Sequence, residues 1–252
     1  MCYDSFAHPP FPTERVGASK GEDLILTATD GTKFNAFAAQ AETPRKTRVV
    51  ILPDVRGLHR FYKDLALLFG EAGYNTLAID YFGRTAGLTP RDDAFEFMPH
   101  VEQMRAAGIE ADLNAAIAAC RAEASDAPIV TVGFCMGGTL SLLAAANERH
   151  DLAGAVGFYA GLSRARGGNP TVLDRAEAIR VPVLGLFGGA DQGIPASEVE
   201  QLDQTLDRTG VSHEMVIYPG APHSFFDRRW TDFADASADA WTRILGFLAA
   251  RG

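Results

Sequence analysis

Between residues 47 and 220 the chain alternates short apolar runs with longer helical segments. The apolar runs are rich in Val, Ile and Leu, which is typical of strands buried on both faces. Strands that alternate with helices predict a parallel sheet covered on both sides. The predicted strands span 47–54, 74–82, 128–134, 152–160, 181–189 and 213–220, and the predicted helices span roughly 60–72, 100–124, 137–148, 196–209 and 231–250.

A different pattern precedes this alternation. Residues 23–39 contain strand-like stretches around Asp30-Gly31, a turn dipeptide, and therefore predict an antiparallel hairpin. Residues 1–22 include several prolines and predict an extended arm laid on the surface. The rest of the chain, 23–252, is expected to form one α/β domain, because 252 residues are enough for one large core.

Turn-rich segments follow most of the predicted strands. In parallel sheets covered by helices, ligands bind at the carboxyl ends of the strands, so functional residues are expected in these loops. The segments are PDVRG, DYFGR, GFCMGG, FGGADQG and YPGAPHS.

Composition narrows the classes of function. The net charge of −9 and the pI near 5.1 argue against a surface for nucleic acids or anionic membranes. Residues 1–17 lack the features of a signal peptide, and no apolar run reaches the roughly 18 residues that span a bilayer. The three cysteines form no CxxC pair, so neither zinc nor a disulfide framework is expected, and a reducing cytoplasm fits best.

Cys135 lies in VGFCMGG, between an apolar strand and a helical run. This is the strand–turn–helix context of a nucleophile elbow, with cysteine at the position where serine is common. Glycine neighbours permit close backbone approach in a strained turn, and a helix N-terminus favours the thiolate. An isolated cysteine is commonly a buried apolar residue, but this context favours a nucleophile.

Asp191 and His223 each follow a later predicted strand. Alone, such an aspartate is typical of a turn or helix cap, and a loop histidine is usually a surface residue. The order Cys135, Asp191, His223 is, however, the nucleophile–acid–histidine order of α/β-hydrolases, and it predicts a catalytic triad. The other histidines are expected to be structural or solvent-facing, with His59 left open because it lies near the first functional loop; they are His8, His59, His100, His150 and His213.

The motifs VGFCMGG, GGADQGIP and GAPHSF resemble, residue by residue, those of the dienelactone hydrolase family, a cysteine-nucleophile branch of the α/β-hydrolases. The similarity runs from about residue 23 to the C-terminus, with a looser match over 49–84. It implies a single-domain α/β-hydrolase fold with a mostly parallel sheet, helices on both faces and the N-terminal hairpin. It also implies that Cys135, Asp191 and His223 form the triad.

Two further features concern the resting and reacting nucleophile. The family has an acidic residue that faces the resting cysteine, and here Asp54 occupies that position in place of the usual, longer Glu. A cap or turn role after the strand is the other interpretation of Asp54. The backbone N–H groups of Met136 and Val55 are the expected oxyanion donors, because residues after the nucleophile and after an early strand commonly provide them.

The resemblance also implies arginines that hold a substrate carboxylate through paired hydrogen bonds. One family position, four residues after His223, is Asp227 here, with Arg228 adjacent. Aromatic side chains near the predicted loops are expected to form an apolar wall, or else to be ordinary core residues. The substrate-binding candidates are Arg56, Arg84, Arg228, Phe82 and Phe225, and Arg91 is a looser match.

These residues predict hydrolysis of a small lactone or carboxylic ester through a covalent acyl-enzyme, with no metal and no cofactor. The partner is expected to be a small molecule rather than a nucleic acid or membrane, and both monomer and dimer stay open. A broader carboxylester or thioester hydrolase without a carboxylate clamp is the alternative. An intact triad argues against a non-catalytic binding module, and the lack of a resolving cysteine near Cys135 argues against a thiol redox protein.

Overall fold

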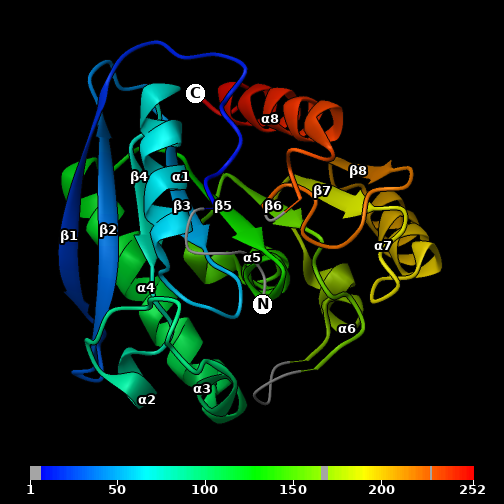
Figure 1. Cartoon of the computed structure of the whole chain (residues 1–252). Coiled ribbons are helices and arrows are strands. Elements are labelled where there is room, and N and C mark those ends of the chain that lie inside the picture. The colour runs from blue at the N-terminus through cyan, green and yellow to red at the C-terminus, as the bar shows by residue number, and fades with distance from the viewer. Residues whose placement is uncertain (1–6, 166–169, 228) are drawn as a thin grey trace.

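The computed structural model describes residues 7–165, 170–227 and 229–252. They form one α/β domain around an eight-stranded sheet with strand order β1-β2-β4-β3-β5-β6-β7-β8 (Figure 1). Neighbouring strands from β4 through β8 pair in parallel, whereas β1 with β2 and β2 with β4 are antiparallel. The predicted fold class is thus confirmed. The strands are β1 Ser19–Thr27, β2 Lys33–Ala41, β3 Arg48–Leu52, β4 Thr76–Ile79, β5 Ile129–Phe134, β6 Gly154–Phe158, β7 Val183–Gly188 and β8 His213–Tyr218.

The helices follow the predicted pattern with one division. The predicted helix 100–124 is two helices, because Met104 and Arg105 adopt extended ψ values that turn the buried Met104 side chain toward the core. The helices are α1 Arg60–Glu71, α2 Gly83–Ala86, α3 Met98–Gln103, α4 Ala106–Glu123, α5 Met136–Ala145, α6 Val172–Arg175, α7 Ala196–Thr209 and α8 Ala234–Ala249, with short 3₁₀ turns η1 Glu148–His150 and η2 Ala176–Ala178.

The first strand begins earlier than expected. β1 pairs with β2 from Ser19 opposite Ala41, so residues 19–22 belong to the hairpin and not to the arm. β1 is an edge strand with a mostly exposed, polar surface, and its N-terminal half therefore lacks an apolar pattern. Residues 7–18 form no helix or strand. They are tied to α8 by the Trp241 indole, which donates to the Pro10 carbonyl at 2.8 Å.

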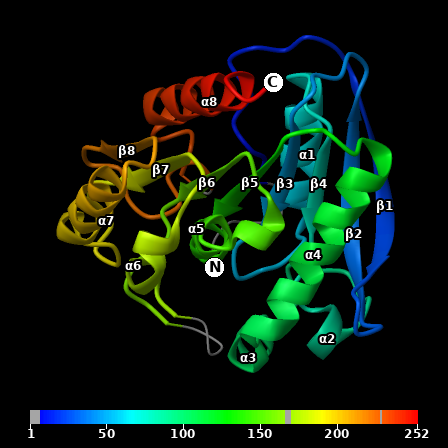
Figure 2. The ribbon, with the colours of Figure 1, turned by 180° about the vertical axis from the view of Figure 1, so that it is seen from behind.

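The sheet is covered on both faces. α1 lies over one face and α4 over the other, as opposite views show (Figures 1 and 2). Alternate residues of β3 divide accordingly, since Val49 and Ile51 join the apolar cluster under α1 while Val50 and Leu52 join the cluster under α4. No helix of the described ranges is long and apolar enough to cross a membrane.

Candidate active site

Cys135 is the single residue between the end of β5 and the start of α5. Its backbone has φ 54° and ψ −112°, a conformation that residues other than glycine rarely adopt. Its N–H donates to the Phe158 carbonyl of β6 at 3.0 Å, which fixes the strained turn to the neighbouring strand. The elbow predicted from the sequence is therefore present, with Cys135 at the carboxyl end of the parallel strands.

Two glycines make this turn possible. A Cβ atom on Gly137 would lie 1.9 Å from the Leu52 carbonyl oxygen and 2.3 Å from that of Pro53. A Cβ atom on Gly133 would lie 1.9 Å from the Gly137 carbonyl oxygen. These distances are far below van der Waals contact, so only glycine permits α5 to begin against the end of β3. The first turn of α5 thereby lies beside the loop that follows β3.

His223 is held by Asp191. The Nδ1 atom of His223 lies 2.6 Å from Oδ2 of Asp191, and the Asp191 side chain is almost fully buried. Burial disfavours the charge of Asp191, but the His223 hydrogen bond and charge, the Gly193 N–H at 2.9 Å and the Arg164 charge together lower its pKa. A carboxylate that accepts from Nδ1–H leaves Nε2 of His223 as the proton-accepting nitrogen.

Tyr159 packs against the ring of His223, with ring centroids 4.9 Å apart. The hydroxyl of Tyr159 donates to Oδ2 of Asp227 at 2.9 Å, and both residues are buried. Burial and the charge of Asp227 raise the pKa of Tyr159, so the phenol stays a proton donor. Tyr159 and Ser224 have φ values of 34° and 60°. Positive-φ residues thus cluster around His223, as strained backbone often does at functional sites.

A cavity of about 250 Å³ brings the predicted triad together. Cys135, Asp191 and His223 all line it, although they come from loops after three different strands. Met136, one of the two predicted oxyanion donors, also lines it, and Val55 lies in the turn after β3. The other lining residues are Thr139, Leu140, Leu143, Tyr159, Gly161, Arg164, Pro170, Gly193 and Ile194.

Asp54 is buried in the loop after β3. Its Oδ1 accepts the Arg56 N–H at 2.8 Å, and its own N–H donates to the Tyr62 hydroxyl at 3.1 Å. Burial raises the pKa values of the phenols Tyr81 and Tyr159, and the negative charges of Asp54 and Cys135 raise them further. Asp54 and Cys135 therefore both act electrostatically on the same two phenols. The role of Asp54 as the acidic partner of Cys135 stays a prediction.

Comparison with known proteins identifies the family. The model of the dienelactone hydrolase family matches residues 34–251. The chain belongs to this family. Two relatives are named "putative carboxymethylenebutenolidase". The relative from Methylorubrum extorquens is 30% identical, and the alignment covers 98% of this chain and 86% of the relative. The relative from Saccharolobus solfataricus is 28% identical, and the alignment covers 90% of this chain and 98% of the relative.

Solved structures agree with the family. The "putative dienelactone hydrolase" of Klebsiella pneumoniae superimposes with a TM-score of 0.79 at 26% identity, covering 92% of this chain and 99% of that one. A dienelactone hydrolase-like promiscuous phosphotriesterase from metagenomic libraries gives 0.76 at 23% identity, covering 93% and 99%, and supports the fold alone. The protein is therefore a member of a family of ester and lactone hydrolases with the α/β-hydrolase fold.

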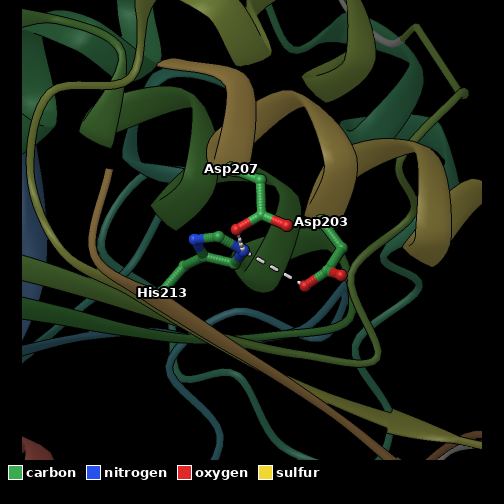
Figure 3. A group of neighbouring side chains, drawn as sticks. All are labelled: Asp203, Asp207 and His213. Atoms are coloured by element: carbon green, nitrogen blue, oxygen red, sulfur yellow. Dashed lines mark hydrogen bonds and ion pairs between the residues drawn. The ribbon is translucent and has the colours of Figure 1, made fainter. Parts of the chain in front are cut away.

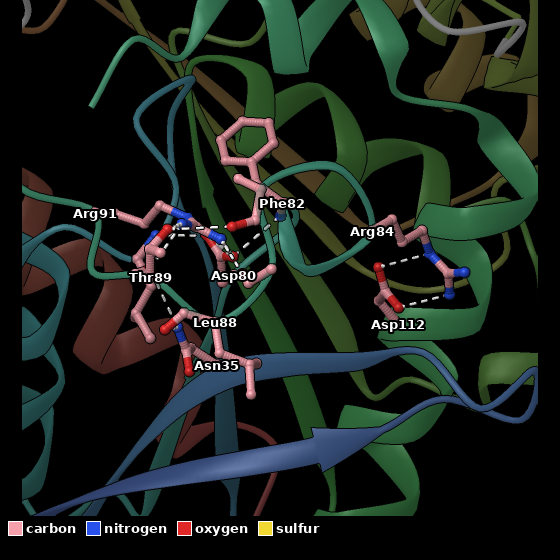
Figure 4. A network of polar contacts seen from close by, with 11 residues as sticks. Asn35, Asp80, Phe82, Arg84, Leu88, Thr89, Arg91 and Asp112 are labelled. Carbon is pink, nitrogen blue, oxygen red and sulfur yellow. Dashed lines mark hydrogen bonds and ion pairs between the residues drawn. The ribbon is translucent and has the colours of Figure 1, made fainter.

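The arginines expected to hold a substrate carboxylate are engaged elsewhere. Arg56 pairs with Asp93 at 2.6 Å. Arg84 pairs with Asp112 at 2.8 Å (Figure 4). Arg84 also pairs with Asp30. Neither residue lines the cavity around Cys135. Carboxylates distant in the sequence pair with both guanidinium groups, an arrangement that does not favour the substrate-binding role expected of them.

Arg91 is also structural. Its guanidinium forms a fully buried ion pair with Asp80 at 2.8 Å and donates to the carbonyls of Thr89 and Gly87 (Figure 4). Asp80 in turn accepts the Phe82 N–H at 3.1 Å. This network fastens the loop after α2 to the end of β4, so Arg91 is not available to a ligand.

The two aromatic candidates belong to the core. Phe82 is fully buried and packs against Phe95, at a ring separation of 5.5 Å, and Phe225 is fully buried against Tyr218, at 4.9 Å. Neither lines the cavity, so both follow the alternative interpretation, that of ordinary core residues. Arg228 lies outside the described residues.

Arg164 is the cavity-lining arginine that sequence reasoning missed. Arg164 lies in the loop after β6. The segments in which functional residues were expected do not include this loop. Its exposed guanidinium lies near Asp191, whose pKa its charge helps to lower. The signal available in the sequence was its position after a buried parallel strand.

His59 has a structural role. His59, left open above, caps α1, since its Nδ1 accepts the Phe61 N–H at 3.2 Å while Nε2 lies 3.3 Å from Asp93. Burial and the charge of Arg56 lower the pKa of His59, which favours this neutral form.

His213 lies beside Asp203 and Asp207 of α7 (Figure 3). Among the described residues, these three side chains form a group whose ligand atoms are close enough together to bind one metal ion. Nε2 of His213 lies 3.1 Å from Asp203 and 3.8 Å from Asp207, while Nδ1 lies 2.7 Å from the Val211 carbonyl. The three side chains could together hold a divalent cation. The group lies at the start of β8, at the other end of that strand from His223.

Proposed function

We propose that the protein hydrolyses carboxylic esters and small lactones by covalent catalysis at Cys135. His223 accepts the thiol proton, and Asp191 orients the imidazole and stabilises its cation. The sulfur attacks the carbonyl carbon and forms a C–S bond. The C–O bond then breaks, and the departing oxygen takes the proton from His223.

Hydrolysis of the resulting thioester completes the cycle. Water attacks the carbonyl carbon while His223 accepts its proton, and the C–S bond breaks to release the acid and restore the thiolate. The N–H groups of Met136 and Val55 are proposed to stabilise the oxyanion in both steps. In this scheme Asp54 is the acidic partner of the resting nucleophile.

The observation that carries the proposal is the convergence of the three predicted residues in one cavity, with His223 fixed on Asp191 at 2.6 Å. The strained elbow supports a nucleophilic role, because such a conformation persists only where the surroundings impose it. The N-terminus of α5 supports a thiolate, because the helix dipole stabilises negative charge there.

The second candidate is a carboxylester or thioester hydrolase of broader scope that lacks a dedicated carboxylate clamp. A specific observation favours it over a strict lactone hydrolase. Arg56, Arg84 and Arg91 are paired with carboxylates of the chain itself, and the family position after His223 holds a buried acid, Asp227.

Three separated cysteines without a CxxC pair support the cytoplasm as the proposed location.

The test is a kinetic comparison on p-nitrophenyl butyrate and on a dienelactone. Cys135→Ala and His223→Ala are expected to lower kcat by roughly 10³-fold or more, as the loss of a nucleophile or base does. Cys120→Ala is the matched control, because Cys120 is a buried thiol of α4 that lies away from the cavity. Acid quenching during turnover followed by mass spectrometry should place the acyl group on the peptide that carries Cys135.

Two results would contradict the proposal. Wild-type turnover by Cys135→Ala would exclude the nucleophile, and an acyl group on another side chain would relocate it. Turnover of the simple ester without turnover of the lactone would select the broader hydrolase.

A further inference from the structure

The cavity around Cys135 continues along one face of α5. Leu140, Leu143 and Pro170 line both this cavity and a second one of about 340 Å³. Along α5 and beyond its end, lining residues recur at helical spacing from Met136 to Asn147, which keeps them on one face of the helix. The two cavities therefore adjoin each other along α5, and we call them together the α5 groove.

Apolar side chains dominate the first part of the α5 groove. Its floor is Leu140 and Leu143, and its wall on the α4 side is formed by Ala106, Ile109 and Leu113, which also follow helical spacing. Leu143 and Ile109 are only half-buried, so apolar surface is available to a ligand. Burying such surface favours an apolar chain by roughly fourfold in affinity for each methylene removed from water.

The far end of the groove is positively charged. Arg149 and Arg175 line it, both are exposed, and neither forms an ion pair with a carboxylate in the part of the chain described. The acid in this cavity, Glu110, is already bonded to His150 at 3.0 Å and to Asn147 at 2.7 Å. Arg175 also donates to the Ala146 carbonyl at 3.3 Å, and the two guanidinium groups together complement an anion.

We propose that the α5 groove binds the acyl chain of the substrate, as an extended apolar chain that ends in an anionic group. This inference rests on the proposed function and specifies its substrate class. Leu143 lies eight residues beyond Cys135, about 12 Å along the helix axis at 1.5 Å per residue. Carbon–carbon bonds of about 1.5 Å advance an extended chain by roughly 1.3 Å each, so about nine carbons reach Leu143.

The acyl arm is assigned to the groove for a mechanistic reason. In the proposed cycle the acyl group stays bonded to Cys135 after the alcohol has left, so a groove that starts at Cys135 can hold this arm through both steps. In an ester the alcohol arm departs before water attacks, which a long groove around that arm would hinder. The groove thus belongs to the part of the substrate that forms the thioester.

The first test measures chain-length selectivity with p-nitrophenyl acetate and p-nitrophenyl octanoate. Wild-type protein should prefer octanoate to acetate by at least about tenfold in kcat/KM. Ala106→Trp places a ring in the groove and should lower the octanoate-to-acetate ratio of kcat/KM at least about tenfold. Ala107→Trp is the matched control, because Ala107 is the next residue of α4, exposed and outside the groove lining. Its ratio should equal that of the wild type.

The second test addresses the charged end with the mono-p-nitrophenyl ester of tetradecanedioic acid and p-nitrophenyl tetradecanoate, because Asn147 lies twelve residues beyond Cys135, about 18 Å at 1.5 Å per residue, which roughly fourteen carbons span. Wild-type protein should favour the carboxylated chain, and Arg149→Gln combined with Arg175→Gln should abolish that preference. Arg180→Gln combined with Arg208→Gln is the charge-matched control, because those arginines pair with Glu148 and Glu177 outside the groove. This control should keep the wild-type preference.

The outcomes separate this inference from the proposed function. Hydrolysis of acetate by wild type with no preference for octanoate, or an unchanged ratio in Ala106→Trp, would overturn the groove assignment while the hydrolase stands. Chain-length selectivity among alkyl acetates in place of acyl esters would overturn the acyl assignment. Absence of turnover of every ester by the wild type would remove the proposed function itself.

Discussion

Nδ1 of His223 lies 2.6 Å from Oδ2 of Asp191, and both side chains line the cavity that contains Cys135. The contact assigns the Nδ1 proton to the bond with Asp191 and leaves Nε2 to exchange protons within the cavity. Because the pKa of Asp191 is lowered, its carboxylate stays ionised through the mildly acidic range and can stabilise an imidazolium. Orientation of the base is thus built into the resting protein.

Asp191→Asn should lower kcat on p-nitrophenyl butyrate by roughly 10²–10⁴-fold, because an amide cannot stabilise the imidazolium and favours the other tautomer. KM should change little, since the substrate does not depend on this side chain for binding. Asp203→Asn, at an aspartate of α7 outside the cavity, should keep wild-type kcat. A wild-type kcat in Asp191→Asn would show that His223 does not depend on Asp191.

Tyr159→Phe should lower kcat severalfold, because the loss of its bond to Asp227 releases the ring that packs on His223. Loss of this buried hydrogen bond to a charged group also costs about 1.5–3 kcal/mol of stability, measured by urea unfolding. Tyr218→Phe removes a comparable bond, to Asp239 at 2.8 Å, and should leave kcat unchanged. Equal kcat values for the two variants would show that Tyr159 does not position His223.

Gly137→Ala should destabilise the protein by about 2–3 kcal/mol or more, because the new Cβ would lie 1.9 Å from the Leu52 carbonyl oxygen. Gly246→Ala is the opposite case, since nothing lies within 4 Å of its Cβ position in α8. Alanine there should stabilise the helix by about 0.5–1 kcal/mol. Urea unfolding followed by circular dichroism measures both changes, and equal stabilities would contradict the close contact of α5 with β3.

Continuous apolar runs and turn-rich strand ends were sufficient to predict the sheet and the residues that meet at its edge. The order of Cys135, Asp191 and His223 along the chain could be matched to a topology because each residue directly follows a strand. The short helices α2 and α6 were not predicted, since one turn of helix carries no periodic apolar signal.

The arginines could not be assigned in the same way. Arg84 pairs with Asp112, a residue of another helix, and Arg91 pairs with Asp80 across a loop. These partners decide whether either arginine can bind a ligand. Such pairings are set by tertiary structure and leave no local pattern. Arg164, by contrast, lines the cavity, and only the arrangement of the loop after β6 shows this.

Asp112 should make stability depend on pH. Burial raises its pKa to about 6 from 3.8, although the hydrogen bonds and charge of Arg84 oppose the shift. The folded state therefore keeps the Asp112 proton where the unfolded state has lost it. As pH rises from 3.8 to about 6, this residue lowers the free energy of unfolding, and above pH 6 the full cost is present.

Asp112→Asn removes this dependence, so its stability relative to wild type should rise by about 2 kcal/mol between pH 4.5 and 7.5. Asp30→Asn is the control on the same guanidinium. The hydrogen bond of Arg84 lowers the pKa of Asp30 to about 2, so Asp30 is ionised in both states throughout this interval. Its difference from wild type should be constant across the interval in urea unfolding. A constant difference for Asp112→Asn as well would show that Asp112 is ionised in the folded protein already at pH 4.5, with Arg84 outweighing its burial.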